Sequence, residues 1–304
     1  MPAFSRFLRY FMVVGRTGSI RKAADELNVS ASAIDRQILN AEAELGMPLF
    51  ERLPSGLRLT AAGEIFMAAG GKWQKSLGDV RAQVDDLRGL KRGHVDIAII
   101  HALTKGYIPA ALHRVHERYP GITVGVRVLD NEAVRAAVAS GEVDFGVCFE
   151  PQSIRDLTVR AFAEVHLGFV TPAGHPFALR GPTRFSSCVG HTMILPAPPL
   201  AVEQQVRVLQ TAAQVPLHRA ISSDNIQVII SMVLQGLGVG VLTSLDVMTE
   251  VQAGLLAFTP ISDPILKPMT VALTTASSRT LSYAADIVLS EIQQGFAALT
   301  LEDG

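Results

Sequence analysis

Cysteine is scarce in this chain of 304 residues, which contains only Cys148 and Cys188. Neither cysteine belongs to a CxxC pair or stands at ligand spacing from a histidine. The sequence therefore gives no support for a disulfide framework or a structural zinc site. We interpret both cysteines as buried small hydrophobic residues.

Long apolar runs are also missing. No run reaches the ~18 residues that a membrane-spanning helix needs, and the start lacks the apolar segment and cleavage site of a signal peptide. The composition, 48% hydrophobic and 18% charged, is typical of folded domains. We expect a cytoplasmic protein with two or three domains.

Sequence motifs of catalysis are absent as well, since there is no GxSxG, no HExxH and no nucleophile with an ordered base. His113 and His116 have no third ligand, which favours surface histidines over a metal site. Gly236, Gly238 and Gly240 leave a predicted helix and enter a strand, whereas a phosphate-binding loop leaves a strand and enters a helix. We expect no enzyme activity, no metal and no cofactor.

The formal net charge is small, at −1, but its distribution is uneven. Residues 1–92 carry 14 lysines and arginines against 10 acidic residues, and residues 93–304 carry 13 against 18. A basic head and an acidic body are expected if only the head meets phosphates. The surplus in residues 1–92 is modest, so tight binding to a polyanion would need two such segments that act together.

Two short helices joined by a tight turn are predicted near the N-terminus. Ser19 is a good N-cap for a helix that ends near Leu27, and Ser30 for a second helix that ends near Leu45. Small and branched apolar residues at helical spacing would let the two helices cross closely. They are Ala23, Ala24, Leu27, Val29, Ala33, Ile34 and Ile38. This pattern is typical of a helix-turn-helix, whose second helix enters a major groove of DNA.

A hairpin follows these helices. Gly46 suits a left-handed helix end, and residues 49–52 and 57–60 flank a turn at residues 53–56. We interpret this hairpin as a wing whose Arg52 and Arg58 approach the DNA backbone or minor groove. The alternative for each arginine is a solvated charge on a small hairpin.

A long helix is predicted from about residue 61 to residue 87, with Thr60 as its cap. Its apolar residues alternate at spacings of four and three: Phe66, Gly70, Trp73, Leu77, Val80, Val84 and Leu87. Such a seam favours pairing with the same helix of another subunit, and the alternative is packing on the chain's own C-terminal part. Gly70 costs about 1 kcal/mol of helix propensity and indicates a close helix approach or a kink.

From residue 94 onward, apolar strands alternate with helices. Strands are expected at residues 95–100, 122–129, 143–149, 157–163, 165–170, 191–195, 219–222, 239–242, 255–258 and 269–274. Helices are expected at residues 108–119, 131–140, 201–213, 225–235 and 282–298. This order implies mostly parallel sheets covered by helices. Crossings near Ala163 and near residues 264–268 would give two lobes with a cleft between them.

The stretch from residue 11 to residue 63 closely resembles the N-terminal domain of the LysR-type transcriptional regulators. The matching positions include residues 17–19, 23–24, 36–38, 49–52 and 59–63, and a looser resemblance continues to the C-terminus. The resemblance implies an α/β protein: an N-terminal winged helix-turn-helix (1–60), a long dimerising linker helix (61–89) and a two-lobed α/β effector-binding domain like the periplasmic binding proteins (90–304). Lobe I would comprise about 90–162 and 268–304, and lobe II about 163–267.

Candidate DNA-reading residues lie on the first turns of the second helix. They are Ala31, Ser32, Asp35 and Arg36, with Ser30 near phosphate, and Thr17, Ser19, Arg52 and Arg58 complete the expected interface. The family usually has Gln in place of Ala31 and Ser in place of Asp35, so its base code does not transfer directly. Asp35 either accepts from cytosine N4 or pairs with Arg36, Arg9 or Arg6. Ser19 is equally a plain helix cap.

Candidate effector-binding residues follow the carboxyl ends of the strands, where ligands bind in open α/β sheets. They are His101, Leu103, Thr104, Asp130, Asn131, Phe149, Glu150, Pro196, Ala197, Ser223, Asp224 and Asn225. Thr104 and the helix start beside it would suit an organic anion, which Glu150 and Asp224 would repel if both face the pocket. Any of these residues is alternatively a cap, Asp224 and Asn225 above all.

By resemblance, the chain would be a sequence-specific transcriptional regulator, a homotetramer built as a dimer of dimers that binds and bends double-stranded promoter DNA. A small-molecule effector between the lobes would modulate it. One rival is an enzyme or cytoplasmic small-molecule-binding protein that uses the cleft directly, with the head as an oligomerisation module. Another is an architectural DNA binder without a ligand.

Overall fold

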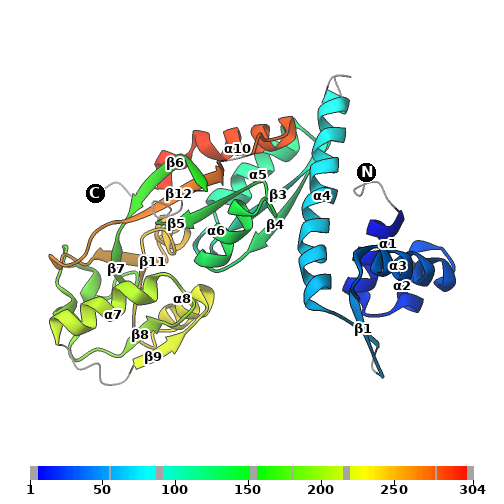
Figure 1. Ribbon diagram of the computed structural model, residues 1–304. Coiled ribbons are helices and arrows are strands. Elements are labelled where there is room, and N and C mark those ends of the chain that lie inside the picture. Colours follow the sequence, from blue (N-terminus) through cyan, green and yellow to red (C-terminus); the bar gives the residue numbers. More distant parts are fainter. Residues whose placement is uncertain are drawn as a thin grey trace. The chain divides into compact units, whose positions relative to one another are not determined.

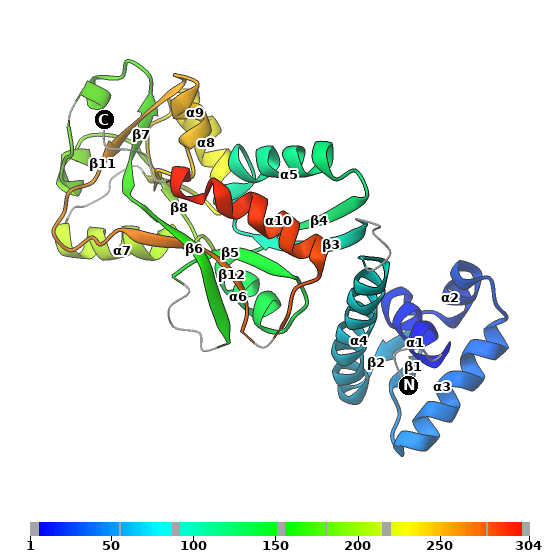
Figure 2. The same ribbon diagram turned by 90° about the horizontal axis from the view of Figure 1, so that it is seen from above.

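The computed structural model describes residues 6–54, 56–86, 92–150, 156–179, 181–214, 220–277 and 279–299. The chain forms two compact units, Met1–Leu87 and Arg88–Gly304, whose ribbons are drawn in Figures 1 and 2. No helix in the described ranges is both long and apolar enough to cross a membrane.

The N-terminal unit contains four helices and a hairpin in its described part. Its elements are α1 (Arg6–Thr17), α2 (Ile20–Leu27), α3 (Ala31–Leu45), β1 (Phe50–Leu53), β2 (Gly56–Leu59) and α4 (Ala61–Asp86). The predicted N-caps of α2 and α3 are confirmed, since Ser19 Oγ accepts from Lys22 N at 3.4 Å and Ser30 Oγ from Ala33 N at 3.3 Å. Gly46 ends α3 with φ of 71°, as expected.

An apolar core holds the helices of this unit together. Its buried residues are Tyr10, Phe11, Val14, Ala23, Ala24, Ile34, Ile38, Leu49 and Phe50. Three of them, Tyr10, Phe11 and Val14, lie on α1, a helix that was not predicted from the sequence. The wing hairpin pairs β1 with β2 in antiparallel register, with Phe50 opposite Leu59.

The apolar seam of α4 is divided between two environments. Phe66 packs edge-on against Phe11 and Trp73 in the head, and Gly70 faces α1 so closely that a Cβ there would lie 2.9 Å from Leu8 Cδ1. Gly70 therefore marks a close helix approach, one of the two predicted possibilities. Further along, Val80 is 53% exposed. The seam thus packs on its own head at one end, while the side chains of the last seam positions, 84 and 87, lie outside the described residues.

Lobe I of the second unit contains a five-stranded sheet in the order β4-β3-β5-β12-β6. Its strands are β3 (Gly93–Ile99), β4 (Ile122–Val128), β5 (Phe145–Phe149), β6 (Leu157–Val165) and β12 (Met269–Ala276). Its helices are α5 (Tyr107–Arg118), α6 (Asn131–Ala139) and α10 (Tyr283–Gln294), and short 3-10 turns add η2 (His101–Leu103) and η6 (Phe296–Leu299). In Figures 1 and 2, α5 and α10 lie on one face of this sheet and α6 on the other.

Lobe II contains a second five-stranded sheet, in the order β11-β7-β10-β8-β9. Its strands are β7 (Leu167–Pro172), β8 (Met193–Pro196), β9 (Ala220–Ser223), β10 (Val239–Thr243) and β11 (Leu256–Pro260). Its helices are α7 (Val202–Ala213), α8 (Ile226–Leu234) and α9 (Met248–Gln252), with short turns η4 (Pro176–Leu179) and η5 (Phe185–Cys188). Sequence reasoning missed α9 and the short turns.

Three details of the second unit differ from the expectations. Both sheets are mixed, since β12 runs antiparallel to its neighbours β5 and β6, and β7 runs antiparallel to β10 and β11. The first crossing between lobes falls at His166, after β6, rather than near Ala163. The last helix ends at Gln294, because Gly295 follows and the chain continues as a 3-10 turn.

Candidate nucleic-acid interface and effector pocket

The first two turns of α3 present small side chains and Arg36, a cation without an ion-pair partner among the described residues. Ser30, Ala31, Ser32 and Arg36 are exposed, and Ser32 Oγ lies 3.2 Å from Ser30 Oγ. Within the described residues, Arg36 makes no ion pair. The cap at Ser30 fixes where the helix begins, so this polar tip is held clear of the core that Ile34 and Ile38 enter.

Asp35 forms an ion pair, but with a partner that the sequence reading did not consider. Arg52 Nη2, on the wing strand β1, lies 2.7 Å from Asp35 Oδ1, in place of the expected Arg36, Arg9 or Arg6. The pairing was not visible in the sequence because the two residues are 17 positions apart and meet only when the wing folds beside α3.

The second wing arginine is also paired. Arg58 Nη2 lies 2.7 Å from Glu51 Oε2 across the hairpin, and hydrogen bonding to Glu51 raises the pKa of Arg58. Both arginines are exposed, so their ion pairs can exchange with phosphate oxygens. In this structure the wing therefore carries little uncompensated positive charge.

Thr17 and Ser19 have local structural roles. Thr17 Oγ1 donates to Val13 O at 2.9 Å and lies 3.1 Å from Ser19 O. Ser19 caps α2. Their hydroxyl groups secure the α1–α2 corner, and their place in a DNA interface stays a prediction.

A pocket opens between the two lobes of the second unit and encloses about 340 Å³ of free space, part of it open to solvent. Lobe I contributes Ile100, His101, Ala102, Leu129, Asp130, Asn131 and Phe149, and lobe II contributes Pro199, Leu200, Ala201, Val202, Ile226 and Asp246. The lining is mainly apolar with a few polar groups, which is typical of small-molecule sites.

The structure brings four of the twelve expected effector residues into this lining, namely His101, Asp130, Asn131 and Phe149. The other eight lie outside it: Leu103, Thr104, Glu150, Pro196, Ala197, Ser223, Asp224 and Asn225. Several of these eight residues have structural roles outside the pocket. Thr104 Oγ1 donates to His101 O at 2.9 Å, Glu150 Oε1 accepts from Thr270 N at 2.8 Å, and Asn225 caps α8 as anticipated.

Asn131 and Asp130 hold the edge of the pocket in place. Asn131 Oδ1 accepts from Phe149 N at 2.7 Å and its Nδ2 donates to Phe149 O at 3.2 Å, which ties α6 to the end of β5. Asp130 Oδ1 accepts from Ala133 N at 2.8 Å and so caps α6. Both polar atoms of the Asn131 amide thus bond to the backbone of Phe149, and the rest of the residue lines the pocket.

Asp246 is the titratable residue of the pocket that sequence reasoning missed. Its Oδ2 accepts from both Thr243 N and Thr243 Oγ1 at 2.8 Å, in the turn after β10. Burial raises the pKa of Asp246 to about 6, against the lowering effect of these hydrogen bonds. The sequence feature that could have identified Asp246 is its position just after a strand. The same rule selected the other candidate loop residues.

An ion pair joins the lobes beside this pocket. Lys105 Nζ, in lobe I, lies 2.8 Å from Glu250 Oε1 on α9 of lobe II, and the Glu250 side chain is only 8% exposed. The two lobes also approach closely next to this ion pair, because a Cβ on Gly106 would lie only 2.7 Å from Thr249 Oγ1.

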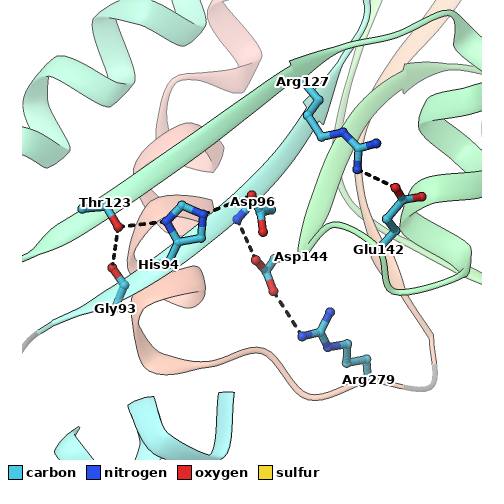
Figure 3. A network of polar contacts seen from close by, with 8 residues as sticks. All are labelled: Gly93, His94, Asp96, Thr123, Arg127, Glu142, Asp144 and Arg279. Carbon is cyan, nitrogen blue, oxygen red and sulfur yellow. Dashed lines mark hydrogen bonds and ion pairs between the residues drawn. The ribbon is translucent and has the colours of Figure 1, made fainter. Parts of the chain in front are cut away.

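A separate polar network fixes the start of lobe I, as Figure 3 shows. Asp96 N donates to Asp144 Oδ2 at 2.8 Å, and Arg279 Nη2 lies 3.3 Å from Asp144 Oδ1. His94 contacts Asp96 and Thr123 at 3.2 and 2.9 Å. None of these residues lines the pocket, so we interpret the network as structural.

The remaining sequence candidates have ordinary surroundings. Cys148 and Cys188 are buried free thiols, as predicted, and His113 and His116 are exposed on α5. In the part of the chain that the structure describes, no three metal-ligating side chains come together.

Two family profiles match the chain. The profile described as "Bacterial regulatory helix-turn-helix protein, lysR family" matches residues 5–64, and "LysR substrate binding domain" matches residues 88–297. A probable RuBisCO transcriptional regulator of Porphyra purpurea is 27% identical over 274 residues, which cover 86% of this chain and 84% of the relative.

Solved structures resemble the chain over nearly its whole length. A full-length OxyR variant from Pseudomonas aeruginosa has a TM-score of 0.70 at 22% identity, covering 98% of this chain and 97% of that one. Full-length CbnR complexed with its target DNA has a TM-score of 0.68 at 17% identity, covering 95% and 98%. At these identities the likeness concerns the fold.

A winged helix-turn-helix head and a two-lobed α/β body define a DNA-binding protein with a small-molecule sensor. The chain belongs to the LysR family of DNA-binding transcriptional regulators, and residues 88–297 form the family's effector-binding domain.

Proposed function

We propose that this regulator recognises a specific promoter sequence through the N-terminal turns of α3 and is controlled by a small molecule held between lobes I and II. The observation that carries the first part is the exposed tip of α3, where Ser30 caps the helix and Arg36 makes no ion pair within the described residues. Such a tip fits a major groove, where arginine reads guanine bidentately.

The proposed DNA interface consists of the residues expected from the sequence, and these residues have two different roles. Ala31, Ser32, Asp35 and Arg36 face base edges. Ser30, Thr17, Ser19, Arg52 and Arg58 lie toward phosphates, and the two wing arginines exchange their carboxylate partners for the DNA backbone.

Two heads act together in this proposal. The modest positive surplus of residues 1–92 supports a requirement for paired heads, and the exposed Val80 on α4 supports a helix pair between subunits. We propose a dimer of dimers, with residues 1–60 as the DNA-binding domain, 61–89 as the dimerising linker and 90–304 as the sensor. In this proposal the protein works in the cytoplasm and is not an enzyme.

The test compares the affinity of full-length wild type and Arg36→Ala for bound genomic fragments and for random DNA of equal length. Loss of one bidentate base contact lowers specific affinity by about 1–3 kcal/mol, or roughly 5- to 150-fold, with little change on random DNA. Arg207→Ala, an exposed arginine of α7 in the sensor, is the matched control. Equal losses on both DNAs would show that Arg36 does not read sequence.

A further inference from the structure

The pocket between the lobes has acidic side chains and lacks strong bases. Among the described residues that line it, Asp130 and Asp246 are carboxylates, His101 is the single imidazole, and no lysine or arginine is present. An organic anion would meet two like charges there, and Arg135, the arginine bonded to the lining, already donates to Phe149 O at 2.9 Å. This is the opposite of what Thr104 suggested in the sequence, since Thr104 lies outside the lining and donates to a backbone carbonyl.

Asp246 has an unused acceptor at this site. Its Oδ2 takes both hydrogen bonds from Thr243, whereas Oδ1 has no hydrogen-bond partner among the described residues. The side chain belongs to a residue that is only 7% exposed, and it lines the pocket. Oδ1 is not one of the fully buried side-chain atoms without a partner, so it is accessible from the pocket and available to a ligand donor.

Helix N-termini oppose the effect of the two carboxylates, because they attract anions. Three helices begin at the pocket, namely α6, α7 and α8. The end of α6 is already capped by Asp130 and that of α8 by Asn225, so only α7 lacks a side-chain cap. A side-chain cap does not remove the macrodipole, but each end is equivalent to about half a positive charge, so the three ends together fall short of the two carboxylates.

The walls define the rest of the ligand. Leu129, Phe149, Leu200, Val202 and Ile226 surround the polar groups with apolar surface. These apolar walls suit a ligand with a compact apolar body.

We propose that the effector is a small organic cation, an amine with an apolar body, whose ammonium group donates to Asp246 Oδ1 and lies near Asp130. This proposal rests on the proposed function only in treating the pocket as the effector site.

The test uses full-length protein and pairs of probes that match in size and differ in charge. Benzylamine and benzoate form one pair, and cyclohexylmethylamine and cyclohexanecarboxylate another. Calorimetric titration at about pH 7.5 should give tighter binding for the amine of each pair. Asp246→Asn should weaken amine binding at least about 10-fold, the loss expected when one charge-assisted hydrogen bond is replaced by a neutral one. Asp286→Asn, which changes an exposed carboxylate of α10 outside the lining, should not.

Wild-type protein supplies a test that does not depend on a variant's folding. Amine affinity should fall as the pH is lowered from about 7.5 to about 5, because Asp246 takes up a proton near pH 6. His101 and Asp130 are the other titratable groups of the described lining.

Several outcomes would overturn the ligand class: no amine binding more tightly than its matched carboxylate, or unchanged amine affinity in a folded Asp246→Asn variant. Gel shifts with the same amines test the proposed function separately. Amine binding that depends on Asp246 but leaves DNA affinity unchanged would support the ligand class and contradict the effector role.

Discussion

Asp35 places a negative charge on the surface that we expect to face DNA, and it holds Arg52 in an ion pair at 2.7 Å. Replacing Asp35 with serine removes the repulsion of phosphates and releases Arg52 toward the backbone. We expect higher affinity for random DNA and a salt dependence steeper by about 0.9 in the slope of log K against log salt, the increment for one added phosphate contact. Titrations between about 50 and 200 mM salt measure both quantities.

The control for this substitution is Asp25→Asn, which removes an exposed carboxylate of α2 that forms no ion pair within the described residues. It should raise affinity through long-range charge only, without the added slope. If Asp35→Ser behaves like Asp25→Asn, or if adding Arg52→Ala leaves the gain intact, the ion pair does not restrain Arg52.

Asp246 gives the sensor a definite pH dependence. Its pKa rises from 3.8 to about 6 on folding, so the folded state binds more protons between these values and loses stability as the pH rises through about 6. Asp246→Asn cannot ionise, and its amide oxygen still accepts from Thr243. We expect the variant to gain about 1–3 kcal/mol relative to wild type between about pH 4.5 and pH 7.5 in urea unfolding of the full chain. A pH-independent difference would contradict the shifted pKa.

At the residue scale, the sequence located part of the pocket. The rule that ligands bind at strand ends selected His101, Asp130, Asn131 and Phe149, which line the pocket. It did not distinguish side chains that face the cleft from those that hydrogen-bond the local backbone, such as Thr104. The Asp35–Arg52 pair was equally hidden, since its geometry depends on how the wing packs beside α3.

At the scale of elements, the contact between α1 and α4 depends on Gly70. A Cβ there would lie 2.9 Å from Leu8 Cδ1 and from Met12 Sδ, so Gly70→Ala must push these side chains apart. We expect a net destabilisation of the head by about 0–2 kcal/mol, which is an overpacking cost of about 1–3 kcal/mol less the ~1 kcal/mol gained in helix propensity. Thermal unfolding followed by fluorescence of Trp73, the chain's single tryptophan, measures it.

The neighbouring Gly71 is the matched control, because a Cβ there meets nothing within 4 Å. Gly71→Ala should raise helix stability by up to about 1 kcal/mol. Equal effects of the two substitutions would mean that α4 does not pack on α1 as described.

Most elements follow from local chemistry and were therefore predictable. Ser19, Ser30 and Gly46 signal helix boundaries through their own hydrogen bonds or φ angles, and the structure places the boundaries there. Strand direction is a different matter, since the antiparallel placement of β12 and β7 depends on the chain's two crossings between lobes. The seam of α4 shows the same limit, because a heptad pattern does not say which neighbour covers each turn.

At the scale of the whole sensor, Lys105 and Glu250 couple the lobes. Glu250 is nearly buried, and its Oε2 has no partner among the described residues, so Lys105→Met would leave its carboxylate largely uncompensated. We expect a loss of roughly 1–2 kcal/mol, because the half-exposed lysine is partly screened by solvent. Adding Glu250→Gln should recover part of the loss in chemical denaturation. Additive losses in this double-mutant cycle would show that the pair does not hold the lobes together.

The central claim is that the exposed tip of α3 reads a DNA sequence. Sequencing the genomic fragments that full-length protein retains at about 150 mM salt tests it most directly. We predict enrichment of a few fragments that share an imperfectly palindromic site, as expected for paired heads, and loss of this enrichment in Arg36→Ala. Recovery of fragments at random, or an unchanged profile in Arg36→Ala, would contradict the claim.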